Sequence, residues 1–479
     1  MKPLFQLLFA IAIVLVFNSC DDTLDTDAGT TGIAFSKDTL TFDTVFTTIG
    51  SATARVMVYN RRSQPLIIEN LYLAGGNNSP FRVNVDGSTN KDHRFGPITL
   101  RARDSMYIFV EVKINPLQSD APILIRDSIL FTTDDGSTKM VLEAFGQDME
   151  VLRSLRIRKD TLLNAKLPYL IYGDLVVDTA ATLKLAPGTR LFFHNNSNLL
   201  VYGNLKAEGT RAEPVSIRGD RMDKIGFTTP VPYNLVAGQW GGVYLLNPTG
   251  NHVLRNVNIN SGYVGIYYVN RDKQNKPHLE ISDCRIHNFL FYNLVEVNGD
   301  MTVSNSAITN SGGYTVYLNG GRHTFYHCTI ANYFNNPTQS VARDNAPAFM
   351  MMTLARSYPM VTRVYNSIIA GSAQNELSLA SRFDSLYKAD IAFSYIKRTK
   401  ALDLPQFRQV RWSALRDTVF KGTVQNLEKE LTYNFMPDSV SPARGIADPE
   451  MAKRFPFDLN GRNRLADGAP DAGAYEWGN

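Results

Sequence analysis

The stretch of sequence that decides the fold reads VSNSAI at residues 303–308 and FYHCTI at residues 325–330. Further copies of this six-residue phrase are LRNVNI (254–259), ISDCRI (281–286), VYNSII (364–369) and IAFSYI (391–396). Every copy begins with an apolar residue and ends with Ile, and consecutive copies start 27, 22, 22, 39 and 27 residues apart. A repeat with a period of roughly 20 to 50 residues indicates that one small structural unit is built many times.

The spacing of the apolar residues predicts strands rather than helices. A helix would repeat them every three or four positions over about ten residues, whereas the phrase spaces them by two or three. A coil of about 22 residues has room for three short strands and three turns. Coils stacked about 4.8 Å apart would bury Ile286, Ile308 and Ile330 in one column. We therefore expect a right-handed parallel β-helix, the hand that parallel connections favour.

The third position of the phrase predicts a turn. It holds Asn256, Asn305 and Asn366 in three copies, and Asp283, His327 and Phe393 in the others. Asn adopts the left-handed backbone conformation more readily than most residues and bonds to neighbouring backbone. We expect this position to form one corner of every coil.

The first residues predict export and a lipid anchor. Lys2 precedes an apolar run over 4–17 that is too short to span a membrane and suits a signal peptide, here residues 1–19. The Cys20 that follows resembles the cleavage box of bacterial lipoproteins, and this implies membrane lipid on Cys20 and an outer-membrane location. The alternative is an ordinary signal peptide with an unrelated Cys.

An acidic linker is expected over 20–31. Its Asp21, Asp22, Asp25 and Asp27 resemble the surface-export signal of Bacteroidetes lipoproteins. That resemblance implies exposure at the cell surface. The alternative is that the acidic run is only a solvated linker and the protein faces the periplasm.

Residues 32–148 are expected to form an immunoglobulin-like β-sandwich. Ile108, Val110 and Val112 hold every second position of one stretch, and DDG at 134–136 separates two apolar runs as in a β-hairpin. The phrase VYN at 58–60 and the closing Phe145-Gly146 resemble Hydin-type domains, which implies a spacer or binding module without catalytic residues.

A linker over 149–165 and a β-helix over 166–400 are expected next. YGDL at 172–175 recurs as YGNL at 202–205, and WGGVY follows at 240–244. This stretch resembles the first coils of right-handed parallel β-helix repeat lipoproteins of Bacteroidetes. The resemblance implies the all-β fold but carries little about function.

Residues 401–479 are expected to be a C-terminal closing segment. Ser441-Pro442-Ala443, then Asp458, Arg464 and DAGAYE at 471–476, resemble the end of choice-of-anchor proteins. We expect Asp458 and Arg464 to pair or to bind backbone in a polar cap at the end of the stack, with a metal site as the weaker alternative.

Composition limits the partners. The chain has 49 Lys and Arg residues and 45 Asp and Glu residues, so its net charge is 49 − 45 = +4. This small charge does not favour a nucleic-acid partner, and none is expected. Cys284 and Cys328 hold the same phrase position two coils apart, about 9 to 10 Å by the strand spacing. That separation is beyond disulfide reach, so both are expected to be buried small residues.

The search for catalytic chemistry favours a protein without an active site. The repeats lack the closely spaced Asp pairs and the Gly-His-Gly phrase of the β-helical polygalacturonases. His278, His287, His323 and His327 lack zinc spacing, and no Asp cluster has calcium spacing. We expect no metal and no cofactor, and a solvated surface explains these His residues.

The aromatic residues after the repeated phrases are the candidate ligand site. An exposed ladder of them offers flat faces for sugar rings, and the hypothesis names Tyr267, Tyr292, Tyr317 and His323. The favoured function is non-catalytic binding of a polysaccharide, or adhesion, at the cell envelope through the flank near 260–340. The alternatives are a polysaccharide lyase or glycoside hydrolase, and a structural surface stalk. The insertion between 325 and 364 is expected to wall one side of the groove.

The lipid anchor gives the first prediction. Cys20→Ala should abolish incorporation of labelled fatty acid, because the thiol that would carry the lipid is gone. Labelling is measured on the protein purified from cells, with Cys328→Ala as the matched control. Unchanged labelling after Cys20→Ala would refute the anchor.

Overall fold

The chain forms two compact units, residues 1–147 and 148–479. The computed structural model describes residues 31–225, 231–270, 277–336, 341–343, 345–353, 358–379, 384–413, 418–423 and 433–478. Cys20 and the whole expected signal peptide lie outside the described residues. The described chain is all-β, with one short helix, α2 (Pro449–Ala452), and two 3-10 turns. Of the described helices, none has the length and apolar character needed to cross a membrane.

The first unit is a sandwich of two sheets, whose strands alternate buried and exposed side chains. One sheet has the order β1 (Ile33–Phe35), β3 (Ala54–Asn60), β9 (Ser105–Val112), β5 (Phe81–Val85), β6 (Ser88–Thr89). The other has the order β2 (Thr39–Phe46), β11 (Gly136–Gln147), β10 (Ile123–Thr133), β4 (Leu66–Leu73), β7 (Arg94–Phe95), with β8 (Ile98–Leu100) also on β4.

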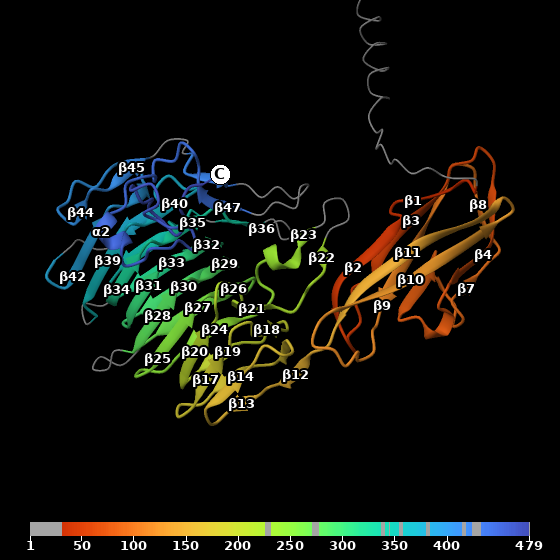
Figure 1. Cartoon of the computed structure of the whole chain (residues 1–479), viewed down its shortest axis with the longest axis horizontal. Coiled ribbons are helices and arrows are strands. Elements are labelled where there is room, and N and C mark those ends of the chain that lie inside the picture. Colours follow the sequence, from red (N-terminus) through yellow and green to blue (C-terminus); the bar gives the residue numbers. More distant parts are fainter. Residues whose placement is uncertain are drawn as a thin grey trace, which may run out of the picture. The chain divides into compact units, whose positions relative to one another are not determined.

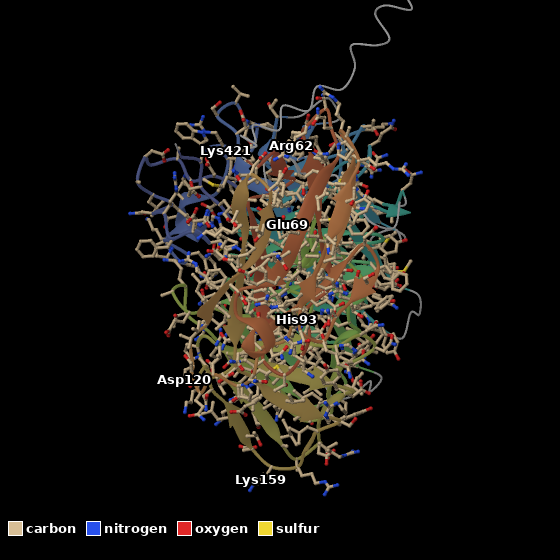
Figure 2. The ribbon with its side chains drawn as sticks, turned by 90° about the vertical axis from the view of Figure 1, so that its right-hand side faces the viewer. Arg62, Glu69, His93, Asp120, Lys159 and Lys421 are labelled. Carbon is tan, nitrogen blue, oxygen red and sulfur yellow. The ribbon has the colours of Figure 1, made fainter. Side chains whose placement is uncertain are left out.

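The expected hairpin at 134–136 is confirmed. Thr133 pairs with Gly136 across a two-residue turn between β10 and β11. Arg62, labelled in Figure 2, bonds both turn carboxylates, with 3.3 Å between its Nη1 and Asp134 Oδ1 and a second contact to Asp135. This half-buried arginine ties the turn to the loop after β3.

The second unit consists mainly of three long parallel sheets, labelled in Figure 1 from yellow through green to blue. Sheet 1 contains β12 (Glu150–Arg153), β15 (Tyr169–Tyr172), β18 (Arg190–Phe193), β21 (Val215–Gly219), β26 (Val257–Asn260), β29 (Arg285–Phe289), β32 (Ala307–Ser311), β35 (Thr329–Asn332), β40 (Ile368–Gly371), β43 (Tyr395–Lys397) and β45 (Arg411–Ser413). Sheet 2 contains β13 (Arg156–Ile157), β16 (Leu175–Val177), β19 (Leu199–Val201), β24 (Gly242–Leu245), β27 (Val264–Val269), β30 (Tyr292–Val297), β33 (Val316–Asn319), β38 (Phe349–Met352) and β41 (Leu377–Leu379). Sheet 3 contains β14 (Thr161–Leu163), β17 (Thr182–Leu185), β20 (Asn204–Glu208), β25 (Asn251–Arg255), β28 (His278–Ser282), β31 (Asp300–Ser304), β34 (Gly321–Tyr326), β39 (Met360–Tyr365), β42 (Tyr387–Ala392) and β44 (Phe407–Arg408).

From β12 to β42 the chain passes through sheet 1, sheet 2 and sheet 3 in turn, and each such passage is one coil of the stack. After β43 it goes directly to β44 in sheet 3 and then to β45 in sheet 1. The first coil is β12, β13 and β14, so most of the expected linker over 149–165 is already part of the stack. This coil was expected to be a linker because the first repeated phrase of the stretch, YGDL, begins only at residue 172. At the other end, β44 and β45 carry the stack beyond the expected limit at 400.

The predicted column of Ile residues is confirmed. Ile259, Ile286, Ile308, Ile330, Ile369 and Ile396 are consecutive partners along sheet 1, and each is fully buried. The first residues of the phrase form a second buried column along sheet 3, from Leu254 to Ile391. Each coil therefore buries its apolar side chains against the coils above and below it.

The predicted corner between sheet 3 and sheet 1 is confirmed at every copy of the phrase. Asn256, Asp283, Asn305, His327, Asn366 and Phe393 all have φ between 46° and 54°. Each also donates its backbone N–H to a carbonyl of the next coil, as Asn305 does to Tyr326 at 2.9 Å. The side-chain ladder is partial, with Asn305 donating to Asp283 at 2.6 Å and Asn366 bonded to His327 at 2.9 Å.

A second ladder runs through the fourth position of the phrase. The hydroxyls of Ser306, Ser367 and Ser394 each accept the backbone N–H of the previous coil's fourth residue, at 3.0 Å. Cys284 and Cys328 hold this position as free, buried thiols, as predicted, and burial raises the pKa of each to about 12. The column needs a small side chain that also bonds backbone, which explains its Ser and Cys.

The C-terminal segment lies along the side of the stack rather than only across its end. Its Leu459, Ala472 and Ala474 pack against Ala307 and Ala331 on the outer face of sheet 1, in a cluster with other apolar residues. The expectation of a terminal cap is therefore wrong for residues 441–478, which we call the strap. Small side chains on sheet 1 allow the strap to approach closely.

Buried polar contacts fix the strap. Asp458 accepts backbone N–H groups from Asn460, Arg462 and Glu476 at 2.7–2.9 Å. Arg464 is fully buried and donates to Glu476 and to Asn305, each at 2.6 Å. The expectation of backbone binding is met by Asp458. Arg464 pairs with Glu476 rather than with Asp458, and its bond to Asn305 attaches the strap to the corner ladder.

The Ile column gives the second prediction. Ile308→Asp should lower the free energy of unfolding by more than about 4 kcal/mol, because it buries an unpaired charge. Leu162→Asp is the control, since that strand residue is 62% exposed and should change stability by about 0.5 kcal/mol or less. Urea denaturation measures both, and equal effects would contradict the register.

Candidate ligand-binding face

The outer face of sheet 2 carries a column of apolar and aromatic side chains. Successive strand partners along it are Val176, Leu200, Tyr244, Tyr267, Val295, Tyr317 and Met350. The alternation that sends Ile266 and Leu294 inward sends these side chains outward. The ring centroids of Tyr244 and Tyr267, one coil apart, are 5.6 Å from each other.

More aromatic rings flank this column at the corner between sheet 1 and sheet 2. Tyr292 stacks on Tyr314 with 6.0 Å between centroids, and Tyr314 contacts Tyr317 at 5.6 Å. Phe291, which is 50% exposed, lies 5.8 Å from Tyr263. We call Tyr244, Tyr263, Tyr267, Phe291, Tyr292, Tyr314 and Tyr317 the aromatic face.

Three of the four predicted ligand residues meet on this face. Burial raises the pKa of Tyr317, and the neighbouring Tyr314, Tyr292 and Tyr267 hydroxyls raise it further. Tyr267, Tyr292 and Tyr317 thus come from three successive coils to one half-buried surface. The Tyr317 hydroxyl also contacts Met352 Sδ at 2.8 Å, which holds its ring against the next coil.

The aromatic face is uncharged. Within β24, β27, β30, β33 and β38, as far as they are described, none of the outward side chains is Asp, Glu, Lys or Arg. Asp174 lies near Tyr244 at the lower end, but its carboxylate is bonded to the backbone and side-chain N–H groups of Asn198 at 2.9 and 2.8 Å. The face can stack flat apolar rings and donate hydroxyls, and its described strands present no acid–base pair.

Two aromatic residues of the same stretch belong to the core instead. Tyr268 and Phe289 are buried. Tyr268 shares the inward parity of Ile266, whereas Phe289 follows Asn288, whose φ of 60° interrupts the alternation of its strand.

Tyr244 lies in the outward column. It was not among the predicted ligand residues, because it precedes the first copy of the phrase. The sequence around WGGVY could have predicted that Tyr244 points outward. It lies between the apolar Val243 and Leu245, which are both buried.

The fourth predicted ligand residue, His323, lies inside the stack. Its side chain is fully buried and bonds the buried Glu296 carboxylate, while its Nδ1 lies 3.0 Å from Thr362 Oγ1. Burial raises the pKa of Glu296, and the bond from His323 opposes that rise. His323 stands two residues before the inward Phe325 in β34, so strand alternation places it inward, and its selection as a surface ligand was wrong.

Of the other three His residues, His278 is exposed as expected, whereas His327 and His287 are not. His327 is buried, and burial lowers its pKa well below the usual value. Burial lowers the pKa of the half-buried His287 to about 4. Across the described residues, no group of three or more His, Cys, Asp or Glu side chains is placed to hold a metal ion.

The insertion after β35 leaves the stack at the corner between sheet 1 and sheet 2. Arg343 fastens it through a buried ion pair to Glu376, with 2.6 Å between Nη2 and Oε2, and through a bond to the Asn332 carbonyl at 2.6 Å. Glu376 also accepts the backbone N–H groups of Ala348 and Ala373. The insertion is thus anchored beside the corner that carries Phe291 and Tyr314.

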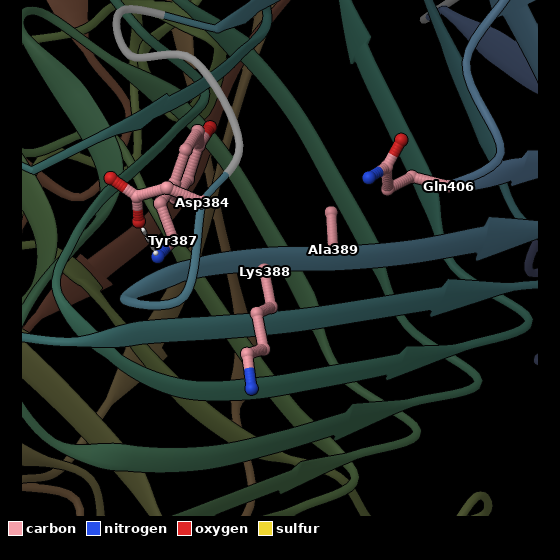
Figure 3. Close-up of a pocket in the computed structure, with 5 residues that line it drawn as sticks. All are labelled: Asp384, Tyr387, Lys388, Ala389 and Gln406. Carbon is pink, nitrogen blue, oxygen red and sulfur yellow. Dashed lines mark hydrogen bonds between the residues drawn. The ribbon is translucent and has the colours of Figure 1, made fainter.

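A separate hollow lies at β42, near the last coils (Figure 3), with a volume of about 320 Å³. Asp384, Tyr387, Lys388, Ala389 and Gln406 line it. Asp384 there accepts the backbone N–H groups of Leu386 and Tyr387 at 2.7 and 2.9 Å, so it braces a turn. The lining holds no second carboxylate that could share catalysis with it.

No family model matches the chain. The Protein bark beetle of Drosophila melanogaster is 35% identical over 102 residues, which are 20% of this chain and only 3% of that protein. Among solved structures, a family 123 glycoside hydrolase from Clostridium perfringens is 10% identical and covers 27% of this chain and 30% of its own, with a TM-score of 0.19. The PapD-like domain 7 of human CEP192 is 12% identical and covers 25% and 89%, with a TM-score of 0.17.

The buried Glu296–His323 pair gives the third prediction. His323→Ala should lower the free energy of unfolding by about 3–5 kcal/mol, because it leaves a buried carboxylate without its partner. The double change Glu296→Leu and His323→Leu should cost less than His323→Ala alone. His194→Ala is the control, since His194 is half-exposed beside Asp220 and such a pair contributes about 1 kcal/mol or less. Thermal unfolding that ranks these variants otherwise would contradict the buried pair.

Proposed function

We propose that the second unit winds as a right-handed parallel β-helix and binds a neutral glycan, without catalysis, through the aromatic face. The hand follows from the strong preference of parallel strand connections for right-handed crossovers. Three sheets visited in turn, with parallel pairing throughout, support the β-helix.

One observation carries the proposed ligand class. Tyr244 and Tyr267 are outward strand partners in consecutive coils, and Tyr317 holds the same column two coils later, after Val295. No described outward side chain of those strands is charged. Sugar rings have apolar faces that pack on aromatic rings, and their hydroxyls bond to tyrosine hydroxyls. An uncharged ladder suits a neutral sugar chain lying along the stack better than a uronate polymer.

Among the residues that the structure describes on this face, none forms a catalytic pair, and this supports binding over catalysis. Glycoside hydrolases need two carboxylates on either side of the bond they cleave, and Asp174, the carboxylate near Tyr244, is occupied by Asn198. A lyase would need a base close to the bound sugar, and His323, the one basic residue among the four predicted ligand residues, is buried with Glu296.

The setting we infer is the cell envelope. In this proposal Cys20 carries the lipid that anchors the protein in the outer membrane. The sandwich of residues 32–148 acts as a spacer in the chain between this anchor and the β-helix. This part rests on the sequence signals alone, and labelling of the Cys20 variant tests it.

The aromatic face gives the fourth prediction. Tyr267→Ala, Tyr292→Ala and Tyr317→Ala should each weaken glycan binding by about 0.5–1.5 kcal/mol, roughly two- to tenfold in Kd. Calorimetry against a panel of neutral and acidic polysaccharides measures this, with Tyr107→Ala on the sandwich as the control, since Tyr107 is also partly exposed.

Three results would contradict the proposal. Equal affinity of the folded triple variant for every bound glycan would show that the ligand sits elsewhere. Full binding by residues 32–148 alone would make the stack a support. New reducing ends or unsaturated uronates in the same incubations would favour the lyase or hydrolase.

A further inference from the structure

The outer face of sheet 1 has a different chemistry from the aromatic face. Two neighbouring columns run across β18, β21, β26 and β29, and we call their residues the basic face. The first column holds Arg190, Ser216, Asn258 and Arg285, and the second holds Phe192, Arg218, Asn260 and His287. In the next coils the same positions hold small residues such as Ala307, which the strap covers.

Side chains of the basic face have unused hydrogen-bonding capacity. Arg190, Ser216 and Asn258 are half-buried, and across the described chain their side chains make no hydrogen bond and no ion pair. Among the described residues, Arg218 donates hydrogen bonds to the carbonyls of Gly219 and Arg221 alone, at 3.2 and 2.7 Å. These half-exposed donors and acceptors are therefore available to a ligand.

The basic face also lacks negative charge of its own. Burial lowers the pKa of Arg190, and lowers that of Arg218 to about 10, although Asp220 opposes the second shift. Asp220 itself is bonded to His194 at 2.6 Å. Arg285 is occupied by the strap, through Asn460 Oδ1 at 3.0 Å. Two half-buried guanidinium groups, Arg190 and Arg218, therefore stand without a carboxylate bonded to them.

We propose that the basic face is a second ligand site, which binds the carboxylate or sulfate groups of an acidic polysaccharide. A planar guanidinium matches these oxyanions with paired hydrogen bonds. Ser216 and Asn258 offer a hydroxyl and an amide to sugar hydroxyls between the cations. The columns span about 14 Å, three steps of about 4.8 Å, which suits a short stretch of polymer. Phe192 is buried, so the basic face presents no exposed ring on which a nucleic-acid base could stack.

The experiment compares Arg190→Gln, Arg218→Gln and their double variant with the parent full chain. Binding is measured by calorimetry to polygalacturonate, a sulfated polysaccharide, a neutral glucan and single-stranded DNA, at low and high salt. Arg322→Gln is the matched control, because Arg322 is an exposed arginine on sheet 3. Each single variant should weaken binding of the acidic polymers about tenfold or more, the effect of losing a charged hydrogen bond, and the double variant should abolish it.

The test is independent of the proposal for the aromatic face. Tyr267→Ala should leave acidic-polymer binding unchanged, and Arg190→Gln should leave neutral-glucan binding unchanged. High salt should weaken binding of the acidic polymers. Unchanged affinity in the double variant, an equal loss in Arg322→Gln, binding of DNA in preference to both acidic polysaccharides, or no acidic polymer bound by the parent would each overturn the second site.

Discussion

The backbone N–H that each left-handed corner residue donates to the next coil is the contact on which the rest of the second unit depends. It occurs at all six copies of the phrase, whether the residue is Asn, Asp, His or Phe. A one-residue corner of this shape fixes the register between neighbouring strands. A shift of the pairing by one residue would turn every Ile of the column outward. Insertions therefore occur elsewhere, as between β35 and β38. The left-handed conformation costs the most free energy at Phe393, because its side chain has no polar group that could hydrogen-bond to the neighbouring backbone.

Much of the second unit was predictable because stacking copies one coil onto the next. The phrase identified the Ile column, the corner and the small fourth residue before any coordinates were known. The phrase did not identify the first coil, which lies at residues 150–163, far before the first copy at 254–259. It also did not identify the strap, whose contacts are long-range and follow no period. Arg464 meeting Asn305 joins residues far apart in sequence, and no local pattern signals such a contact.

The candidate site was partly predictable for the same reason. Tyr267 and Tyr317 were found because they follow the repeats, and sheet alternation then aligns them. His323 was predicted to lie on the surface because of its residue type. Strand alternation predicts the opposite, since Phe325, two residues later in the same strand, points inward. The basic face went unnoticed because arginines scattered along a sequence resemble any solvated surface. Only the register reveals that Arg190 and Arg218 come from adjacent strands with no bonded carboxylate.

The strap has a consequence for how such a protein can evolve. Repeat arrays commonly gain or lose whole repeats, because each repeat contacts only its neighbours. Here Asp458 meets Arg211, Asn460 meets Arg285, Arg464 meets Asn305, and Gly473 meets Asn366. Removing one coil from between these points would displace the later contacts by about 4.8 Å. The strap therefore acts as a ruler, and over the stretch that it spans it holds the number of coils constant.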